Sequence, residues 1–263
     1  MKIGFIGCGN MAGAMINGIL ESGAADGTQI MASAKSEATK RKIVEQYRIL
    51  QGTNREVAQF AEVLFLAVKP QYYPEVIGEI WDAVAVDTIV VSIAPGKRLR
   101  WLEEQFGQPL KLVRAMPNTP AMVKEGMTGI CANAEVSEEE LERVRELCAS
   151  FGRAEIVPEL LMDVVTGVSG SSPAYVFLFI EALADGAVAD GMPRAQAYQF
   201  AAQAVLGSAK MVLETGKHPG ELKDMVCSPG GTTIEAVRVL EEKGLRSAVI
   251  EAEKACVKKS RGL

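Results

Sequence analysis

The chain has 263 residues, 48% of them hydrophobic, which is enough to bury the core of two modest domains or of one large one. Its 33 acidic and 28 basic residues give a net charge of −5, and no basic block would follow a phosphate backbone, which argues against a nucleic-acid partner. With five widely spaced cysteines, no C-x-x-C pair and a single histidine, we expect a reduced, cytoplasmic protein without a metal site.

Two apolar stretches of the sequence are candidates for a membrane segment. Residues 3–20 imitate a signal peptide, but five glycines and two asparagines interrupt the run. Residues 174–184 are too short to span a bilayer and contain Glu181. We therefore expect no membrane-embedded segment.

The first half alternates short apolar runs with helical patterns. Nearly continuous apolar runs are typical of parallel strands covered by helices on both faces, with right-handed crossovers supplied by segments such as 10–22 and 37–47. Ser137 and Glu140 form a capping box that opens a helix running to about Phe151. The predicted strands are residues 2–6, 29–32, 63–67, 88–92 and 111–115, with 128–132 as a candidate for a further strand. This pattern predicts an α/β fold with a doubly wound sheet.

The second half, residues 158–263, is almost entirely helical in its pattern. Residues 173–189 are apolar over nearly the whole helical circumference, which indicates a helix buried on all sides. In so small a domain a second subunit is the natural cover, so we expect a homodimer built through this half. The predicted helices are residues 172–189, 194–214, 219–227, 232–242 and 245–259.

A glycine-rich G-x-G-x-x-A sequence, residues 7–12, follows the first predicted strand and opens a helix. Gly7 permits a tight turn, Gly9 lets a pyrophosphate approach the backbone, and Ala12 allows the helix and strand to pack closely. The N-terminus of the helix faces the negative charge. The sequence therefore predicts a Rossmann-like dinucleotide site, with a merely structural glycine turn as the alternative.

The end of the second predicted strand bears on the choice of cofactor. An acidic residue there would bond the ribose hydroxyls of NAD and repel the extra phosphate of NADP, but the chain has no acid before Glu37. Ser33, Lys35 and Ser36 carry donors for a phosphate, so the sequence favours NADPH, with NADH as the alternative. Lys35 has a second interpretation, as a solvated loop cation.

Four motifs in order along the whole chain resemble those of pyrroline-5-carboxylate reductases: AVKPQ at 67–71, MPNTP at 116–120, GVSGSSPAY at 167–175 and DMVCSPGGTT at 224–233. The first two also occur, in looser form, in related enzymes like six-phosphogluconate dehydrogenase, whereas the last two are specific to this family. The resemblance implies an N-terminal Rossmann-like dinucleotide-binding domain, residues 1–157. It implies that an all-helical substrate-binding and dimerisation domain, residues 158–263, follows.

The activity that the resemblance implies is reduction of 1-pyrroline-5-carboxylate to L-proline, the last step of proline biosynthesis, with NADPH or NADH as hydride donor. Family members form homodimers and also larger rings of dimers. The alternatives are a reductase of another cyclic imino acid and a catalytically silent NADP-binding regulatory protein. A hydroxy-acid substrate is disfavoured because the apolar helix, residues 173–189, has no lysine for proton transfer.

The resemblance places the cofactor along loops that leave the predicted strands. Ala67 and Val68 end a strand at the carboxyl edge of the sheet, where open α/β folds bind ligands, and Pro70 fixes a rigid exit; Lys69 has the alternative of a surface charge. Pro95 departs from the family, which commonly has alanine, and removes a backbone donor. The implied cofactor-binding residues are Ile6, Gly7, Cys8, Gly9, Asn10, Met11, Ser33, Ala34, Lys35, Asn54, Ala67, Val68, Lys69, Pro70, Ile93, Ala94 and Pro95.

The implied substrate-binding residues are Glu159, Met225, Gly230, Gly231, Thr232 and Thr233. The Pro-Gly-Gly turn runs into a helix whose free N–H groups suit a carboxylate. Thr233 is the candidate catalytic residue, orienting the imine nitrogen or relaying a proton to it. The alternative is that Thr232 caps the helix and Thr233 is a first-turn residue.

Other reactive side chains are interpreted as structural. His218 lies in a turn before a short helix, and the carboxylates of Glu181 and Asp185 share a helical face without a metal partner. Cys8 and Cys227 flank the binding loops, and nothing near them in sequence would lower their pKa, so we treat them as packing residues.

Overall fold

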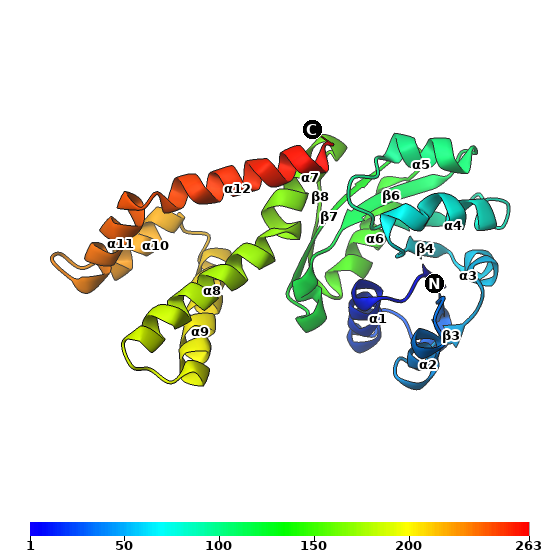
Figure 1. The fold of residues 1–263 in the computed structure, drawn as a ribbon. Coiled ribbons are helices and arrows are strands. Elements are labelled where there is room, and N and C mark those ends of the chain that lie inside the picture. Colours follow the sequence, from blue (N-terminus) through cyan, green and yellow to red (C-terminus); the bar gives the residue numbers. More distant parts are fainter. Residues whose placement is uncertain (263) are drawn as a thin grey trace. The chain divides into compact units, whose positions relative to one another are not determined.

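The structure, a computed structural model, describes residues 1–262. The chain divides into two compact units, Met1–Ser171 with the residues from Cys256 onward, and Ser172–Ala255 (Figure 1). Each unit is described by itself.

The first unit contains one sheet with the strand order β3-β2-β1-β4-β5-β6-β7-β8. Its first six positions follow the strand order of the Rossmann fold, which confirms the predicted doubly wound sheet. All neighbouring strands are parallel except β6 and β7. The strands are β1 Ile3–Ile6, β2 Ile30–Ser33, β3 Leu50–Gln51, β4 Val63–Leu66, β5 Ile89–Ser92, β6 Lys111–Met116, β7 Gly126–Ala132 and β8 Gly152–Ile156.

Helices cover both faces of this sheet. On one face Phe5 of β1 stacks on Phe65 of β4, with ring centroids 4.8 Å apart, in a core shared with α1, α2 and α6. On the other face Leu64 and Leu66 pack with α3, α4 and α5. Burial on both faces explains why the strands read as continuous apolar runs. The helices are α1 Asn10–Ser22, α2 Glu37–Glu45, α3 Asn54–Phe60, α4 Tyr73–Ile80, α5 Leu99–Phe106 and α6 Glu138–Ala149.

Several features of the sheet differ from the sequence prediction. The candidate strand at 128–132 exists as β7 but runs antiparallel to β6, because the connection through the short 3₁₀ helix η3 Thr119–Val123 is shorter than a parallel crossover requires. The strands β3 and β8 were not predicted, since both lie at sheet edges and are mostly exposed. The capping box before α6 is confirmed: Ser137 Oγ accepts from the Glu140 amide, and Glu140 Oε2 accepts from the Ser137 amide.

The segment after β8 belongs to the first unit. It consists of η4 Glu159–Leu161, α7 Met162–Val165 and the π-helix η5 Thr166–Gly170. Met162 is buried in the core of this unit, and Asp163 accepts a hydrogen bond from Ser260 of the returning C-terminus. The compact units therefore divide between Ser171 and Ser172, whereas the predicted functional boundary is at residue 158; that functional division stays a prediction.

The second unit is a set of helices at the predicted positions. They are α8 Ser172–Ala189, α9 Arg194–Thr215, α10 Pro219–Val226, α11 Thr232–Glu242 and α12 Leu245–Ser260, the last of which continues into the first unit. The helices α8 and α9 pack against each other. Among the described residues of α8 only Ala184 is buried, and Phe177 is 62% exposed, so the chain alone does not bury this helix on all sides.

One continuous helical stretch, Glu159–Ala189, has the length and the apolar composition to cross a membrane among the residues that the structure describes. This helical stretch is longer than residues 174–184, the apolar segment that the sequence analysis judged too short to span a bilayer. Core helices of soluble proteins pass the same test, so length and composition do not decide what covers it.

Gly152 is the position in the sheet where a side chain fits least. Its φ is +150, and a Cβ there would lie 2.1 Å from the carbonyl oxygen of Gly126 on the paired strand. We expect Gly152→Ala to lower the free energy of unfolding by about 2 to 4 kcal/mol, since the backbone of β7 or β8 must shift.

The matched control is Gly78→Ala in α4, where a new Cβ meets no atom of the described chain within 4 Å. This variant should gain about 0.5 to 1 kcal/mol because alanine favours a helix interior. Urea unfolding followed by circular dichroism measures both. A Gly152→Ala midpoint at or above that of the wild type would contradict the prediction.

Candidate functional site

The predicted cofactor loops converge at one edge of the sheet. Because β1 is in parallel register with β2 and β4, Ile6 lies beside Ser33 and Leu66, and Leu66 lies beside Ser92 of β5. The segments that follow these four strands therefore leave from the same edge, where open α/β sheets bind ligands. The structure brings together there all of the predicted cofactor residues in Ile6–Met11, Ser33–Lys35, Ala67–Pro70 and Ile93–Pro95.

The glycine turn after β1 is built around close backbone approach. Gly7 has φ +91, and a Cβ there would lie 2.8 Å from Val68 Cγ1 and 2.9 Å from the Ala67 carbonyl oxygen. Gly9 is the N-cap of α1, and a Cβ on it meets no atom of residues 1–262 within 4 Å. No side chain of residues 1–262 caps this helix, so its first amides are left for an anion, as an anion site at a helix N-terminus requires.

Asn54, the one predicted cofactor residue that does not follow a buried strand, reaches this edge from the start of α3. Ser33 Oγ donates to Asn54 Oδ1 at 2.7 Å, and the Gly7 amide donates to Ser33 Oγ at 3.4 Å. Asn54 Nδ2 in turn donates to Glu79 Oε2 of α4 at 2.5 Å. This chain of bonds joins four elements that lie far apart in sequence.

The three phosphate donors predicted near the end of β2 differ in their availability. The Ser33 proton is engaged by Asn54. Ser36 caps α2, where its Oγ accepts from the Thr39 amide and shares a hydrogen bond with the Thr39 hydroxyl. Lys35 is exposed, with its ammonium 5.8 Å from the ring centroid of Tyr72. Of the three, Lys35 is the group free to meet an extra phosphate.

Sequence reasoning missed a hydrogen-bonded pair, Tyr73 and Ser92, that fixes the ends of β4 and β5. The Tyr73 hydroxyl donates to the Leu66 carbonyl at 2.6 Å and accepts from Ser92 Oγ at 3.1 Å. Burial raises the pKa of Tyr73, so the phenol stays protonated and keeps donating. The amide of Ala94 donates to Ser92 Oγ at 3.4 Å, which ties the next loop to the same pair. A buried tyrosine close after Lys69-Pro70 was the available signal.

Cys8 lies within the glycine turn but is not a reactive thiol. It is 5% exposed, and burial raises its pKa to about 11, an effect that the charge of Lys42 only partly offsets. The thiol therefore stays protonated near neutral pH, which agrees with its interpretation as a packing residue.

Glu159 occupies a structural position in the first unit. Its Oε1 accepts from Arg114 Nη1 and from the Leu99 amide, both at 2.7 Å. The Arg114 side chain is only 7% exposed, so its charge needs this partner. The carboxylate thus holds the start of α5 to β6, and its predicted contact with substrate stays a prediction.

The predicted substrate loop of the second unit lies between α10 and α11. Gly230 has φ +65, and the Gly231 amide donates to the Ser228 carbonyl at 3.0 Å, which closes the turn. Gly231 is the N-cap of α11, so the alternative in which Thr232 is the cap is wrong. Within the described residues no side chain caps this helix, and Thr233 is half-buried in its first turn while Met225 is 63% exposed.

The remaining reactive side chains have structural roles in the second unit. His218 Nδ1 accepts from the Gly220 amide at 3.0 Å and caps α10, as a structural histidine would. Asp185 forms an ion pair with Arg194. Among residues 1–262 no group of three or more His, Cys, Asp or Glu is placed to hold a metal ion.

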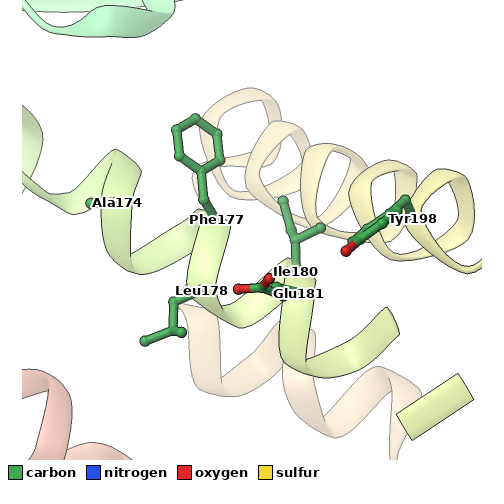
Figure 2. Close-up of a pocket in the computed structure, with 6 residues that line it drawn as sticks. All are labelled: Ala174, Phe177, Leu178, Ile180, Glu181 and Tyr198. Carbon is green, nitrogen blue, oxygen red and sulfur yellow. The ribbon is translucent and has the colours of Figure 1, made fainter. Parts of the chain in front are cut away.

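Glu181 lies in a hollow of about 580 Å³ on α8 and α9. Figure 2 shows its carboxylate beside Leu178 and Ile180, with Tyr198 of α9 across the hollow. A carboxylate surrounded by apolar side chains is typical of a surface that another molecule covers, rather than of an acid–base site.

Comparison with protein families matches both halves of the chain. Residues 159–263 match the family described as pyrroline-5-carboxylate reductase dimerisation. Residues 2–96 match the family described as NADP oxidoreductase, coenzyme F420-dependent.

Individual relatives cover the whole chain. The pyrroline-5-carboxylate reductase of Escherichia coli (strain K12) is 55% identical over 263 residues, which are 100% of this chain and 98% of that protein. The structure of a pyrroline-5-carboxylate reductase from Coxiella burnetii superimposes with a TM-score of 0.94 at 35% identity, covering 99% of this chain and 97% of the other. The Plasmodium falciparum pyrroline carboxylate reductase with NADP bound gives 0.88 at 31% identity, covering 100% and 97%.

Because there is open space at Gly9, a substitution there tests cofactor binding separately from folding. We expect Gly9→Ala to fold normally, since a Cβ there has room and φ is −80. The methyl group would occupy the path of the pyrophosphate, so the Kd for NADPH should rise by about tenfold or more.

Quenching of tryptophan fluorescence by NADPH measures this Kd, and the thermal midpoint of the free protein reports folding. Gly78→Ala on α4 is the control: it should leave the Kd for NADPH unchanged, and its thermal midpoint should not fall below that of the wild type. An unchanged Kd for Gly9→Ala would show that the pyrophosphate lies elsewhere.

Proposed function

This chain belongs to the pyrroline-5-carboxylate reductase family, and we propose that the sheet edge around Gly7 and Gly9 binds the nicotinamide cofactor while the Gly230–Thr233 turn binds the imino acid. The protein is an NAD(P)H-dependent oxidoreductase that reduces 1-pyrroline-5-carboxylate to L-proline. The cofactor supplies a hydride to the C=N carbon, and a proton goes to the ring nitrogen. The single observation that supports the cofactor assignment is the open N-terminus of α1 behind a glycine turn that admits no side chain.

For the extra phosphate of NADPH we propose Lys35 as the contact. It is the exposed cation at the end of β2, and its ammonium lies near the Tyr72 ring, which holds it at this edge. The ammonium of a lysine supplies charge to a phosphate without the fixed geometry of an arginine.

For the substrate we propose a carboxylate clamp at the start of α11. Within the described residues no side chain caps the positive end of this eleven-residue helix, and a Cβ on Gly230 in the preceding turn would meet no atom within 4 Å. Thr233 then places its hydroxyl near the imine nitrogen. A threonine hydroxyl is a weak acid, so its contribution is to orient the ring by a hydrogen bond.

The assay for this proposal follows NADPH and NADH oxidation with racemic 1-pyrroline-5-carboxylate, with a six-membered cyclic imino acid and a 2-keto acid as controls. We expect Thr233→Ala to lower kcat about tenfold or more, because the ring loses its orienting hydrogen bond, and to leave the Kd for NADPH unchanged. Thr233→Ser keeps the hydroxyl and should retain most of the activity.

Three results would contradict the proposal. Full turnover by Thr233→Ala would show that the Thr233 hydroxyl does not orient the substrate ring. Equal rates with the six-membered imino acid would favour a reductase of another cyclic imino acid, and NADPH binding without any turnover would favour the silent regulatory protein.

We also propose that the oligomer is a homodimer built through α8 and α9, as a unit of a larger ring of dimers, in the cytoplasm. The apolar side chains of Phe177, Leu178 and Phe200 are each more than 60% exposed in the single chain, and residues 159–263 match a dimerisation family. Full burial of one such side chain contributes about 1.5 to 3 kcal/mol to association, and a second copy of the chain can bury them. The free cysteines fit a reducing compartment.

The oligomer is tested by Leu178→Glu, which places a charge in the proposed contact. Light scattering coupled to gel filtration at micromolar concentration should show the mass falling from an oligomer to a monomer, because a buried unpaired charge disfavours association. Val86→Glu is the control: Val86 is 66% exposed on the first unit, and its variant should keep the oligomer mass. An oligomer retained by Leu178→Glu would place the contact on another surface.

A further inference from the structure

The carboxylate of Glu79 on α4 belongs to the hydrogen-bonded chain at the cofactor edge, although it is not one of the predicted binding residues. It accepts from Asn54 Nδ2, and Asn54 Oδ1 accepts from Ser33 Oγ at 2.7 Å. Ser33 is the last residue of β2, where a Rossmann-like fold meets the ribose of the adenosine half. Glu79 is thus two side chains away from the position that distinguishes the two cofactors.

The position of Glu79 is fixed by the neighbouring helix. Arg55 Nη1 of α3 donates to the Glu79 carbonyl oxygen at 3.0 Å. The same guanidinium forms two hydrogen bonds with Asp82, of 2.6 and 3.1 Å, which raise the pKa of Arg55 and lower that of Asp82. This forked contact holds the end of α4 against the start of α3.

The carboxylate decides which way the Asn54 amide points. An ionised carboxylate only accepts, so it requires the NH₂ group of Asn54 on its side. The amide oxygen then faces Ser33, and the single proton of the Ser33 hydroxyl must go to it. The Gly7 amide donates to the same hydroxyl oxygen, at 3.4 Å. Ser33 is therefore an acceptor and not a donor toward any ligand.

We propose that Glu79 is a specificity-determining residue that acts through Asn54, by presenting Ser33 as an acceptor to the adenosine ribose and so limiting the preference for NADPH over NADH. The inference rests on the proposed cofactor site. A 2′-hydroxyl of NADH donates to such an acceptor, whereas a 2′-phosphate has only acceptor oxygens and gains nothing from it. Lys35 favours the phosphate, and the chain from Glu79 opposes it.

The test is Glu79→Gln, measured as the ratio of the Kd values for NADH and NADPH by fluorescence titration. A glutamine offers either its oxygen or its NH₂ group, so the Asn54 amide is free to reverse and the Ser33 proton becomes available to the phosphate. We expect the ratio to shift toward NADPH by about fivefold or more, the effect of one additional charge-assisted hydrogen bond. The kcat at saturating cofactor should stay within about twofold, since this position is remote from the hydride.

Two comparisons separate this mechanism from removal of a negative charge. Glu75 lies one helical turn before Glu79 on the exposed side of α4, so Glu75→Gln removes an equal charge from the same helix. The ratio should stay at the wild-type value in Glu75→Gln. In a Ser33→Ala background, Glu79→Gln should no longer shift the ratio, because the hydroxyl that carries the effect is absent.

An equal shift in Glu75→Gln, a shift that persists without the Ser33 hydroxyl, or an unchanged ratio in Glu79→Gln would each overturn the inference. Turnover by the wild-type protein distinguishes a failure of the proposed function from a failure of this inference. Absence of turnover of the imino acid would count against the reductase, while the two Kd values still report whether Glu79 sets the cofactor ratio.

Discussion

The close contact between Gly7 and the end of β4 is the constraint on which the cofactor edge depends. A Cβ on Gly7 would lie less than 3 Å from atoms of Ala67 and Val68. The positive φ of Gly7 is also a backbone conformation that only glycine adopts readily. Because the chain can turn so tightly after β1, α1 begins at Asn10, close to the edge of the sheet. The same contact brings the loop after β4 against the loop after β1, so both lie at that edge.

Around this contact, neutral hydrogen bonds set the positions of the other strand ends. The protonated phenol of Tyr73 bridges the last carbonyl of β4 and the Ser92 hydroxyl of β5 in a buried position. Such fully satisfied polar groups specify one arrangement because any shift leaves a buried donor or acceptor without a partner. The charges at this edge, Lys35 and Glu79, lie on its exposed rim instead, and the role that we propose for them is to select between cofactors.

The sequence predicted the parts of this site that local pattern determines. The strand runs, the G-x-G-x-x-A turn and the helix bounds of α1, α8 and α11 follow from periodicity and from glycine and proline placement, which act over a few residues. The direction of β7 does not, because it depends on the short connection from β6, which is too short for a parallel crossover. The edge strand β8 does not either, because polar residues such as Arg153 and Glu155 hide its apolar pattern. The acceptor state of Ser33 was also beyond reach, since it depends on Asn54 and Glu79, which follow it by 21 and 46 positions.

The second unit shows why composition alone predicted an interface. Every face of α8 carries apolar side chains, yet the helix packed most extensively against it is α9, which covers one side. A helix pair cannot bury two opposite faces by itself, so the rest of the apolar surface needs another molecule. The carboxylate of Glu181 among these side chains bears on whether a lipid or a protein covers α8. A lipid tail offers the carboxylate no hydrogen bond, whereas a protein surface can supply a donor. The physical requirement at α8 therefore favours a protein partner, and a second copy of the chain presents the same surface.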